Sequence, residues 1–198
     1  MYSYRRLNAK QRAKLVSQRL ERGYPPHSPP HPIADRELYL LTAACYEHQP
    51  YMNTDARRQQ ILDSLFEEFT NQGWEIRAWV ILPNHYHILV KIDEFHKLGQ
   101  RLRLIHGRTS YQWNQEDETR GRKIWYHYSD RAIRSERHYH TTLNYIHYNP
   151  VKHQWTSSPY NWTQTSVHWY LKHYGREGLR QSWVEYPVRD YGCNWDDI

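Results

Sequence analysis

Two groups of residues in this sequence combine side-chain types and spacing that could do chemistry. The first is a pair of histidines, His85 and His87, on either side of Tyr86 in an apolar run. Residues two apart on a β-strand point to the same face, so the two imidazoles could hold one cation together. The spacing alone is not specific, because the chain has 14 histidines and His138 and His140 repeat it. Two structural histidines are therefore the alternative.

The second group is the run from Tyr145 to Pro150. Tyr145 and Asn149 are four residues apart and share one face of a helix. The amide oxygen of Asn149 is a reasonable third ligand beside two imidazoles. The phenol of Tyr145, next to a metal-bound phosphodiester, is a candidate nucleophile. A packing tyrosine is the alternative, since the chain has 18 tyrosines; Tyr111 and Tyr148 are the next candidates for the nucleophile.

Hydrophobic periodicity indicates the elements that would position these groups. Their order is β-α-β-β-α-β, which predicts an α+β fold: a ferredoxin-like antiparallel sheet with both helices on one face. A further helix, Glu136–Asn149, would follow and end at Pro150. The second strand alternates, with Trp74, Ile76, Ala78 and Val80 on one face. The predicted strands are 37–45, 74–82, 85–92 and 123–128, and the two helices between them are 55–71 and 97–113.

The excess positive charge lies in an N-terminal arm. Residues 1–23 hold seven Lys and Arg against one acid, so they account for the whole net charge of +6. Asn8 would cap a helix over 9–22, and a proline-rich linker follows. Such an arm can follow DNA phosphates, or it is a solvated helix packed on the body. We therefore divide the chain into an arm and linker (1–36), a catalytic domain (37–150) and a Trp- and Tyr-rich extension (151–198).

Composition narrows the class of protein. The chain has 9 Trp and 18 Tyr but only 3 Phe, which suits stacking on single-stranded nucleic acid or a tyrosine-rich polar core. A mean hydropathy of −1.03 with no long apolar run excludes a membrane protein. Two cysteines cannot build a disulfide framework, and no secretory signal is visible, so we expect a cytoplasmic protein.

Several runs resemble one family. Trp79–Val90 is similar to the metal-site signature of the single-tyrosine HUH transposases, and Tyr145–His153 resembles the helix signature of the branch called REP-associated tyrosine transposases. Between them, Leu104–Tyr111 and Lys123–Trp125 are similar to the second helix and the strand after it. The resemblance covers roughly residues 37–162. Two separate signatures in the right order are more specific than either one.

This resemblance implies an enzyme that cuts and joins single-stranded DNA at hairpin-forming palindromic repeats through a 5′-phosphotyrosine, in the nucleoid. By position, Tyr145 would be the nucleophile, with His85 and His87 as metal ligands. Asn149 stands where related transposases carry glutamine. The ligand set suits Mg²⁺ or Mn²⁺. The basic residues expected to contact DNA are Arg5, Arg6, Lys10, Arg12, Lys14, Arg108 and Lys152.

Two alternatives remain open at this point. A domesticated protein could bind DNA hairpins without cutting them, although such a protein would not need a phenol beside a two-histidine site. The chain could also act as a monomer or as a homodimer with shared sites.

Overall fold

The computed structural model describes residues 37–193 and five positions of the arm, Asn8, Lys10, Gln11, Lys14 and Ser17. Within the arm, Asn8 Oδ1 accepts from the Gln11 N–H and the Asn8 N–H donates to Gln11 Oε1, each at 2.9 Å. This reciprocal pair is a capping box, so the predicted cap at Asn8 is confirmed. The expectations for Arg5, Arg6, Arg12 and the proline-rich linker lie outside the described residues.

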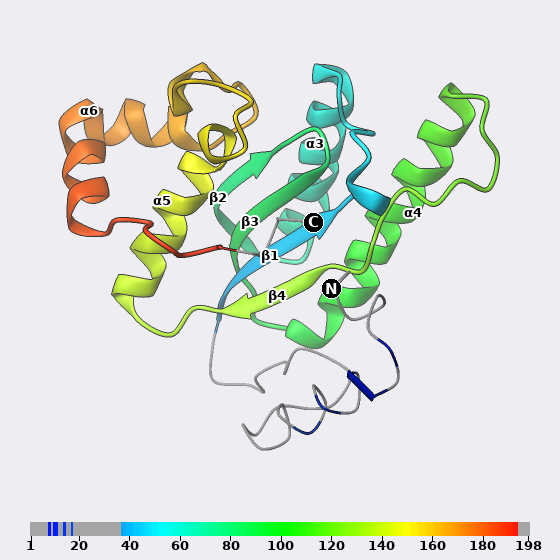
Figure 1. Ribbon diagram of the computed structural model, residues 1–198, viewed down its shortest axis with the longest axis horizontal. Coiled ribbons are helices and arrows are strands. Elements are labelled where there is room, and N and C mark those ends of the chain that lie inside the picture. The colour runs from blue at the N-terminus through cyan, green and yellow to red at the C-terminus, as the bar shows by residue number, and fades with distance from the viewer. Residues whose placement is uncertain (1–7, 9, 12–13, 15–16, 18–36, 194–198) are drawn as a thin grey trace.

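A four-stranded antiparallel sheet forms the centre of the protein (Figure 1). The strand order β2-β3-β1-β4 is that of the ferredoxin-like fold, as the sequence predicts. In the middle, β1 pairs with both β3 and β4, so residues far apart in sequence lie opposite each other. The strands are β1 (Leu38–Ala44), β2 (Glu75–Ile81), β3 (His85–Lys91) and β4 (Ser129–Ala132).

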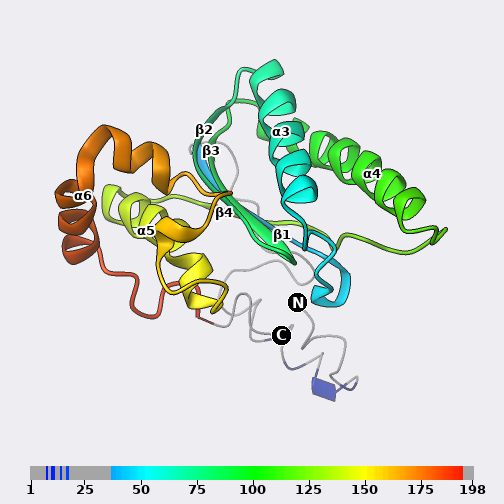
Figure 2. The ribbon, with the colours of Figure 1, turned by 90° about the horizontal axis from the view of Figure 1, so that it is seen from above.

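Helices cover both faces of the sheet, and Figure 2 shows the three layers edge-on. Helices α3 and α4 lie on one face, and α5 lies on the other with α6 beside it. The added C-terminal helix of the predicted α+β fold is therefore present. The helices are α3 (Asp55–Asn71), α4 (Leu98–Glu116), α5 (Glu136–Lys152) and α6 (Val167–Glu185), with 3₁₀ turns at Tyr46–His48, Phe95–Lys97 and Pro159–Asn161.

The alternation of β3 divides its side chains between two cores. Tyr86, Ile88 and Val90 belong to the core under α3 and α4, whereas Leu89 belongs to the core under α5. His85 and His87 alternate with the first set, so they face α5. All residues of β3 except Lys91 are buried, because helices cover the sheet on both sides.

The alternation predicted for β2 is wrong in its first half. The pairing of β2 with β3 shifts between Ile76 and Ala78, where an extra residue enters the strand. Such a bulge turns the side chains before it to the other face. Trp74 and Ile76 therefore pack on the side of α3 and α4, while Ala78 and Val80 pack under α5.

The fourth strand also differs from the prediction. Residues 123–128 pass beyond the end of β1, where they make one bridge, Cys45 to Trp125, and bonds such as the Tyr126 N–H to the Ala44 carbonyl. The regular strand is β4, Ser129–Ala132, because only there does the segment run alongside β1. The aromatic pattern of 123–128 reflects side-chain packing more than a strand, because Trp125 stacks on His106 at 4.4 Å between ring centroids and makes a single bridge to Cys45.

Pro150 does not end α5, which continues to Lys152. A proline removes one N–H and so costs most in a helix interior. Pro150 lies in the last turn of α5, and the backbone hydrogen bonds that end the helix still form around it. The His153 N–H donates to the Asn149 carbonyl at 3.0 Å, and the Trp155 N–H donates to the Pro150 carbonyl at 2.9 Å.

The segment before α6 closes the outer edge of β2. The Trp79 N–H donates to Ser166 Oγ at 3.1 Å, and the Trp79 carbonyl accepts from the Ser166 N–H at 2.9 Å. The Ile81 N–H donates to the Gln164 carbonyl, and the Ile81 carbonyl accepts from Trp162 Nε1, both at 2.9 Å. The extension that the sequence left unassigned thus behaves as a partial fifth strand. Among the described residues, no helix is long and apolar enough to cross a membrane.

We expect His106 to make stability depend on pH. Packing against Trp125 and Tyr86 lowers the pKa of His106 to about 3, because burial disfavours the charged ring. The unfolded chain binds a proton at this residue near pH 6.5, so stability is full above pH 6.5 and is lost as pH falls below it. As a residue His106 is only partly buried, so the loss between pH 7 and 4.5 should be about 1–2 kcal/mol.

Urea unfolding of wild type and His106→Asn at both pH values measures this contribution. The variant should lose less stability on acidification, whereas the exposed control His127→Asn should lose as much as wild type. Equal losses in all three proteins would contradict the assignment to His106.

Candidate functional site

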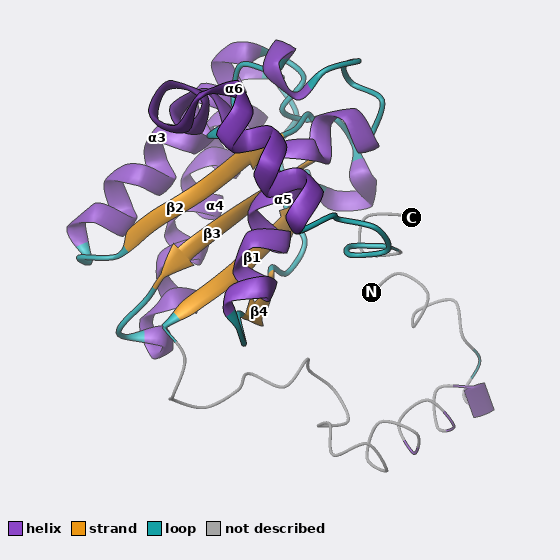
Figure 3. Cartoon of the chain, turned by 90° about the vertical axis from the view of Figure 1, so that its left-hand side faces the viewer, coloured by secondary structure: helices purple, strands orange, loops and turns teal. Residues whose placement is uncertain are grey.

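His85 and His87 lie side by side at the start of β3, beneath α5. Their ring centroids are 5.0 Å apart, and both side chains are buried. Figure 3 shows α5 lying in front of the sheet, and this helix packs on β2 and β3. Both rings contact residues of α5, so they are enclosed between the sheet and this helix. The strand geometry predicted from sequence therefore brings the pair together as expected.

The Nδ1 atoms of both rings are held on the side of the sheet. His87 Nδ1 is 2.8 Å from Thr42 Oγ1, and His85 Nδ1 is 2.8 Å from Asn84 Oδ1. An amide oxygen only accepts, so a neutral His85 ring that donates Nδ1–H to Asn84 presents the lone pair of Nε2 on its other side. Partners of this kind fix the tautomer and direction of imidazoles that bind metal ions.

The Nε2 atoms point toward α5. His85 Nε2 is 3.2 Å from Asn149 Oδ1, and His87 Nε2 is 3.3 Å from Tyr145 Oη. The helix is seated by Leu143 and Ile146, which pack in the same core as strand residues. The structure thus unites all four residues that the sequence singled out as nucleophile and ligands, while their chemical roles stay predictions.

The donor set fits a small cation. His85 contacts two amide oxygens, Asn84 Oδ1 and Asn149 Oδ1, yet a neutral imidazole has one N–H to share between them. A cation beside Nε2 would bind the lone pairs of both the ring and Asn149 Oδ1. A doubly protonated ring would instead donate one N–H to each amide oxygen. Among the described residues, no group of three or more His, Cys, Asp or Glu could hold a metal. Further ligands would have to be amide, water or phosphate oxygens.

Two basic side chains border this site from the end of α5. The His153 ring lies 4.8 Å from that of His85, and Lys152 Nζ lies 5.2 Å from the centre of the Tyr145 ring. Lys152 also donates to the Gly192 carbonyl at 2.8 Å. Of the predicted DNA-contacting residues that the structure describes, Lys152 is therefore the one placed beside the candidate nucleophile.

The chain near residue 192 covers Tyr145, which is 1% exposed. The Tyr191 ring packs edge-on against Tyr145 at 5.5 Å, and its hydroxyl lies 2.9 Å from His138 Nε2. Gly192 has a φ of +77°, and a Cβ on it would lie 2.2 Å from Tyr145 Cε2. Only glycine can cross the ring at this distance.

Sequence reasoning missed the residues that orient the two histidines or cover Tyr145. Asn84 directly precedes His85, so its position was a usable signal. Thr42 could not be found, because it reaches His87 only through the register of β1 with β3. Tyr191 and Gly192 come to Tyr145 from more than 40 residues away.

Other predicted residues are not brought to the site. Arg108 is exposed on α4, in the layer across the sheet from the two histidines. Lys10 and Lys14 are exposed in the described part of the arm. Tyr111 on α4 is 71% exposed and Tyr148 on α5 is 46% exposed. Tyr145, in contrast, is buried with its hydroxyl 3.3 Å from His87 Nε2 and its ring against the His87 ring.

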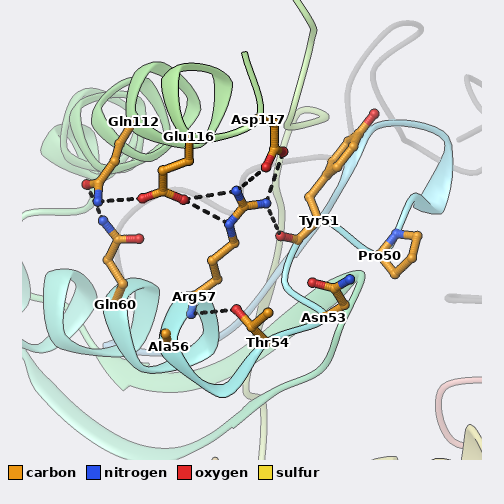
Figure 4. Close-up of a pocket in the computed structure, with 10 residues that line it drawn as sticks. All are labelled: Pro50, Tyr51, Asn53, Thr54, Ala56, Arg57, Gln60, Gln112, Glu116 and Asp117. Atoms are coloured by element: carbon orange, nitrogen blue, oxygen red, sulfur yellow. Dashed lines mark hydrogen bonds and ion pairs between the residues drawn. The ribbon is translucent and has the colours of Figure 1, made fainter. Parts of the chain in front are cut away.

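A polar hollow of about 830 Å³ between α3 and α4 lies on the other side of the sheet (Figure 4). Its one cation, Arg57, is bound by Glu116 and Asp117 and by the Tyr51 carbonyl. Hydrogen bonds from Arg57 and Arg122 lower the pKa of Asp117 to about 2. Because these charges satisfy each other, the network joins the two helices and leaves no charge directed at a ligand.

Comparison with known proteins gives one family match. Residues 38–149 match the model of the family described as Transposase IS200 like. The REP-associated tyrosine transposase of Escherichia coli strain K12 is 28% identical over 126 residues, which cover 59% of this chain and 73% of that protein. A solved structure of a REP-associated tyrosine transposase bound to a REP hairpin has a TM-score of 0.57 at 24% identity, covering 83% of this chain and 90% of the other.

We expect Gly192→Ala to displace the segment that covers Tyr145. The new Cβ would overlap the ring, and alanine is strained at positive φ, so the melting temperature should fall by several degrees, corresponding to about 1–3 kcal/mol. Hydrogen exchange should rise in residues 188–193. Gly107→Ala is the control, because its Cβ meets nothing within 4 Å and alanine favours the helix. Unchanged exchange in Gly192→Ala would show that the ring can yield without moving the segment.

Proposed function

Because the chain belongs to the family of IS200-like transposases, we propose that it is a metal-dependent endonuclease and strand transferase acting on single-stranded DNA beside hairpin-forming repeats. The observation that carries the proposal is the 3.3 Å contact between Tyr145 Oη and His87 Nε2. It puts a phenol directly against the two neighbouring imidazoles of β3. A protein that only bound DNA would not need this pairing.

The proposed reaction exchanges one ester for another. The Tyr145 oxygen attacks the phosphorus of a phosphodiester and loses its proton, and a new P–O bond forms to tyrosine. The bond from phosphorus to the 3′ oxygen breaks, and that oxygen takes a proton to become a free 3′-hydroxyl. The 5′ side stays on the protein as a phosphotyrosine. Attack by a 3′-hydroxyl on this intermediate reverses the step and joins strands, so no net energy source is required.

The side chains assigned to a divalent cation are His85, His87 and Asn149. When bound there, Mg²⁺ or Mn²⁺ would polarise the phosphate and offset its charge in the transition state. Thr42 and Asn84 orient the imidazoles in advance, so little reorganisation is needed when the ion binds. Lys152 adds a positive charge next to the Tyr145 ring, whose oxygen attacks the phosphate.

The proposed substrate follows from the relative that was solved on a REP hairpin. The single-stranded DNA that flanks the stem of such a hairpin has unpaired bases, and those bases would be available for stacking. A fully paired duplex buries its base faces, so it should be bound and cut poorly. Work on chromosomal repeats would place the protein with the nucleoid in the cytoplasm.

A hairpin-binding protein that does not cut is the second candidate, favoured by one observation. Tyr145 is enclosed by Tyr191 and Gly192, so a phosphate cannot reach its oxygen in this arrangement. Cutting therefore requires Tyr191 and Gly192 to move away from Tyr145, whereas hairpin binding without cutting does not. Direct measurement of a covalent product separates the two.

We expect Tyr145→Phe to abolish the covalent DNA–protein adduct while hairpin affinity stays within about twofold, because only one hydroxyl is removed. Radiolabelled hairpins with single-stranded flanks, incubated with Mn²⁺ and resolved on denaturing gels, show the adduct. The control Tyr148→Phe removes a hydroxyl three residues along the same helix from an exposed ring and should keep full adduct yield. An adduct in Tyr145→Phe would mean that another tyrosine attacks, and none in wild type would favour the hairpin-binding candidate.

We expect His87→Ala to lower the rate of cleavage by roughly 100-fold or more, since it removes a ligand and the partner of Tyr145 together. Excess EDTA should abolish cleavage by the wild-type protein, and added Mn²⁺ should restore cleavage. His96→Ala alters an exposed histidine in the 3₁₀ turn after β3, outside the candidate site, and should cleave normally. Full cleavage in EDTA would refute the role of a metal.

A further inference from the structure

A ladder of aromatic rings lies on the first half of α6, outside the segment that matches the family. Trp169 and His173 stack at 3.8 Å between centroids with an angle of 21° between their planes. Tyr170 and Tyr174, also one helical turn apart, stack at 5.7 Å and 23°. Trp169 further contacts both tyrosines, so the four rings form one continuous group. We refer to these four residues as the α6 ladder.

The α6 ladder has one side in the protein and one side in solvent. The inner member, Tyr170, donates its hydroxyl to the Arg77 carbonyl on β2 and packs on His147 at 4.9 Å. The outer members are open: Trp169 is 47% exposed, Tyr174 is 61% exposed and His173 is exposed. Tyr170 therefore anchors the group to the protein, while the outer rings are exposed to solvent. Gly175, with a φ of +68°, kinks the helix directly after the last ring.

The charges around the α6 ladder are mainly positive. Lys172 and Arg176 are exposed on the same stretch of helix, and Arg176 lies 5.2 Å from the Tyr160 ring. The nearby acid, Glu177, is engaged by Arg180 at 2.6 Å. Flat exposed rings beside basic groups match the two chemical parts of a single-stranded nucleotide, its base face and its phosphate.

We propose that the α6 ladder is a base-stacking surface for single-stranded DNA, separate from the two-histidine site. The ligand class rests on the proposed function, while the location rests on the exposed rings and their charges. A duplex is excluded as the main ligand because its base faces are stacked inside. The surface would hold the unpaired strand next to a hairpin, with Trp169 and Tyr174 as the principal stacking rings and Lys172 near the phosphates.

The binding of an unstructured oligo(dT) in EDTA tests this surface without cleavage or a hairpin. Fluorescence anisotropy should show wild type binding, and the double variant Trp169→Ala/Tyr174→Ala should bind at least tenfold more weakly, since each stacked base is worth roughly 5- to 150-fold. The variant Trp169→Phe/Tyr174→Phe keeps two rings and should retain most of the affinity. Lys172→Gln should reduce the slope of log affinity against log salt by about 0.7.

Tyr111→Ala is the matched control, because Tyr111 is 71% exposed on α4 in the opposite layer. It should bind oligo(dT) like wild type. Equal affinity of wild type and the Ala double variant would overturn the proposal, as would no binding by wild type. A change of mass in light scattering for the double variant, with unchanged DNA affinity, would also overturn it and identify a contact between copies. Loss of adduct in Tyr145→Phe bears only on catalysis, so the two proposals fail separately.

Discussion

The packing of α5 on β2 and β3 is the contact on which the candidate site depends. Leu143 and Ile146 share a core with Val80 and Leu89, and this burial fixes where the helix lies. A 17-residue helix gains most of its stability from such packing and not from its own propensity. Once seated, the helix brings Tyr145 and Asn149 within 3.3 Å of two imidazoles whose other nitrogens are already bound. A change in that core would therefore disturb the chemistry without touching a polar residue.

Local periodicity made β3 and α5 predictable. A two-residue period places His85 and His87 on one face, and a four-residue spacing aligns Tyr145 with Asn149; both patterns depend only on the geometry of the element itself. The order of elements then implies the sheet, and the family resemblance links the two patterns. The predicted cap at Asn8 belongs to the same class of local signal.

Features that depend on contacts between distant segments escaped prediction. Thr42 bonds to His87 because two strands meet in one register, and no property of Thr42 alone reveals this. The bulge after Ile76 and the late start of β4 likewise follow from what each segment meets. Gly192 looks like an ordinary loop glycine until the Tyr145 ring lies against it. Which Trp and Tyr residues of the extension are buried and which are exposed depends on how α6 packs against the rest of the protein.

The closed edge of β2 limits how copies of this chain can assemble. Proteins often join by continuing a sheet from one subunit into the next, which needs free N–H and C=O groups along an edge strand. Here the carbonyl of Arg77 and both backbone groups of Trp79 and Ile81 already bind residues 162–170. In this conformation, a dimer cannot run a shared sheet through β2. At the opposite edge the described sheet offers only the four residues of β4, so a contact between copies through the described elements would rest mainly on side chains of the helical faces.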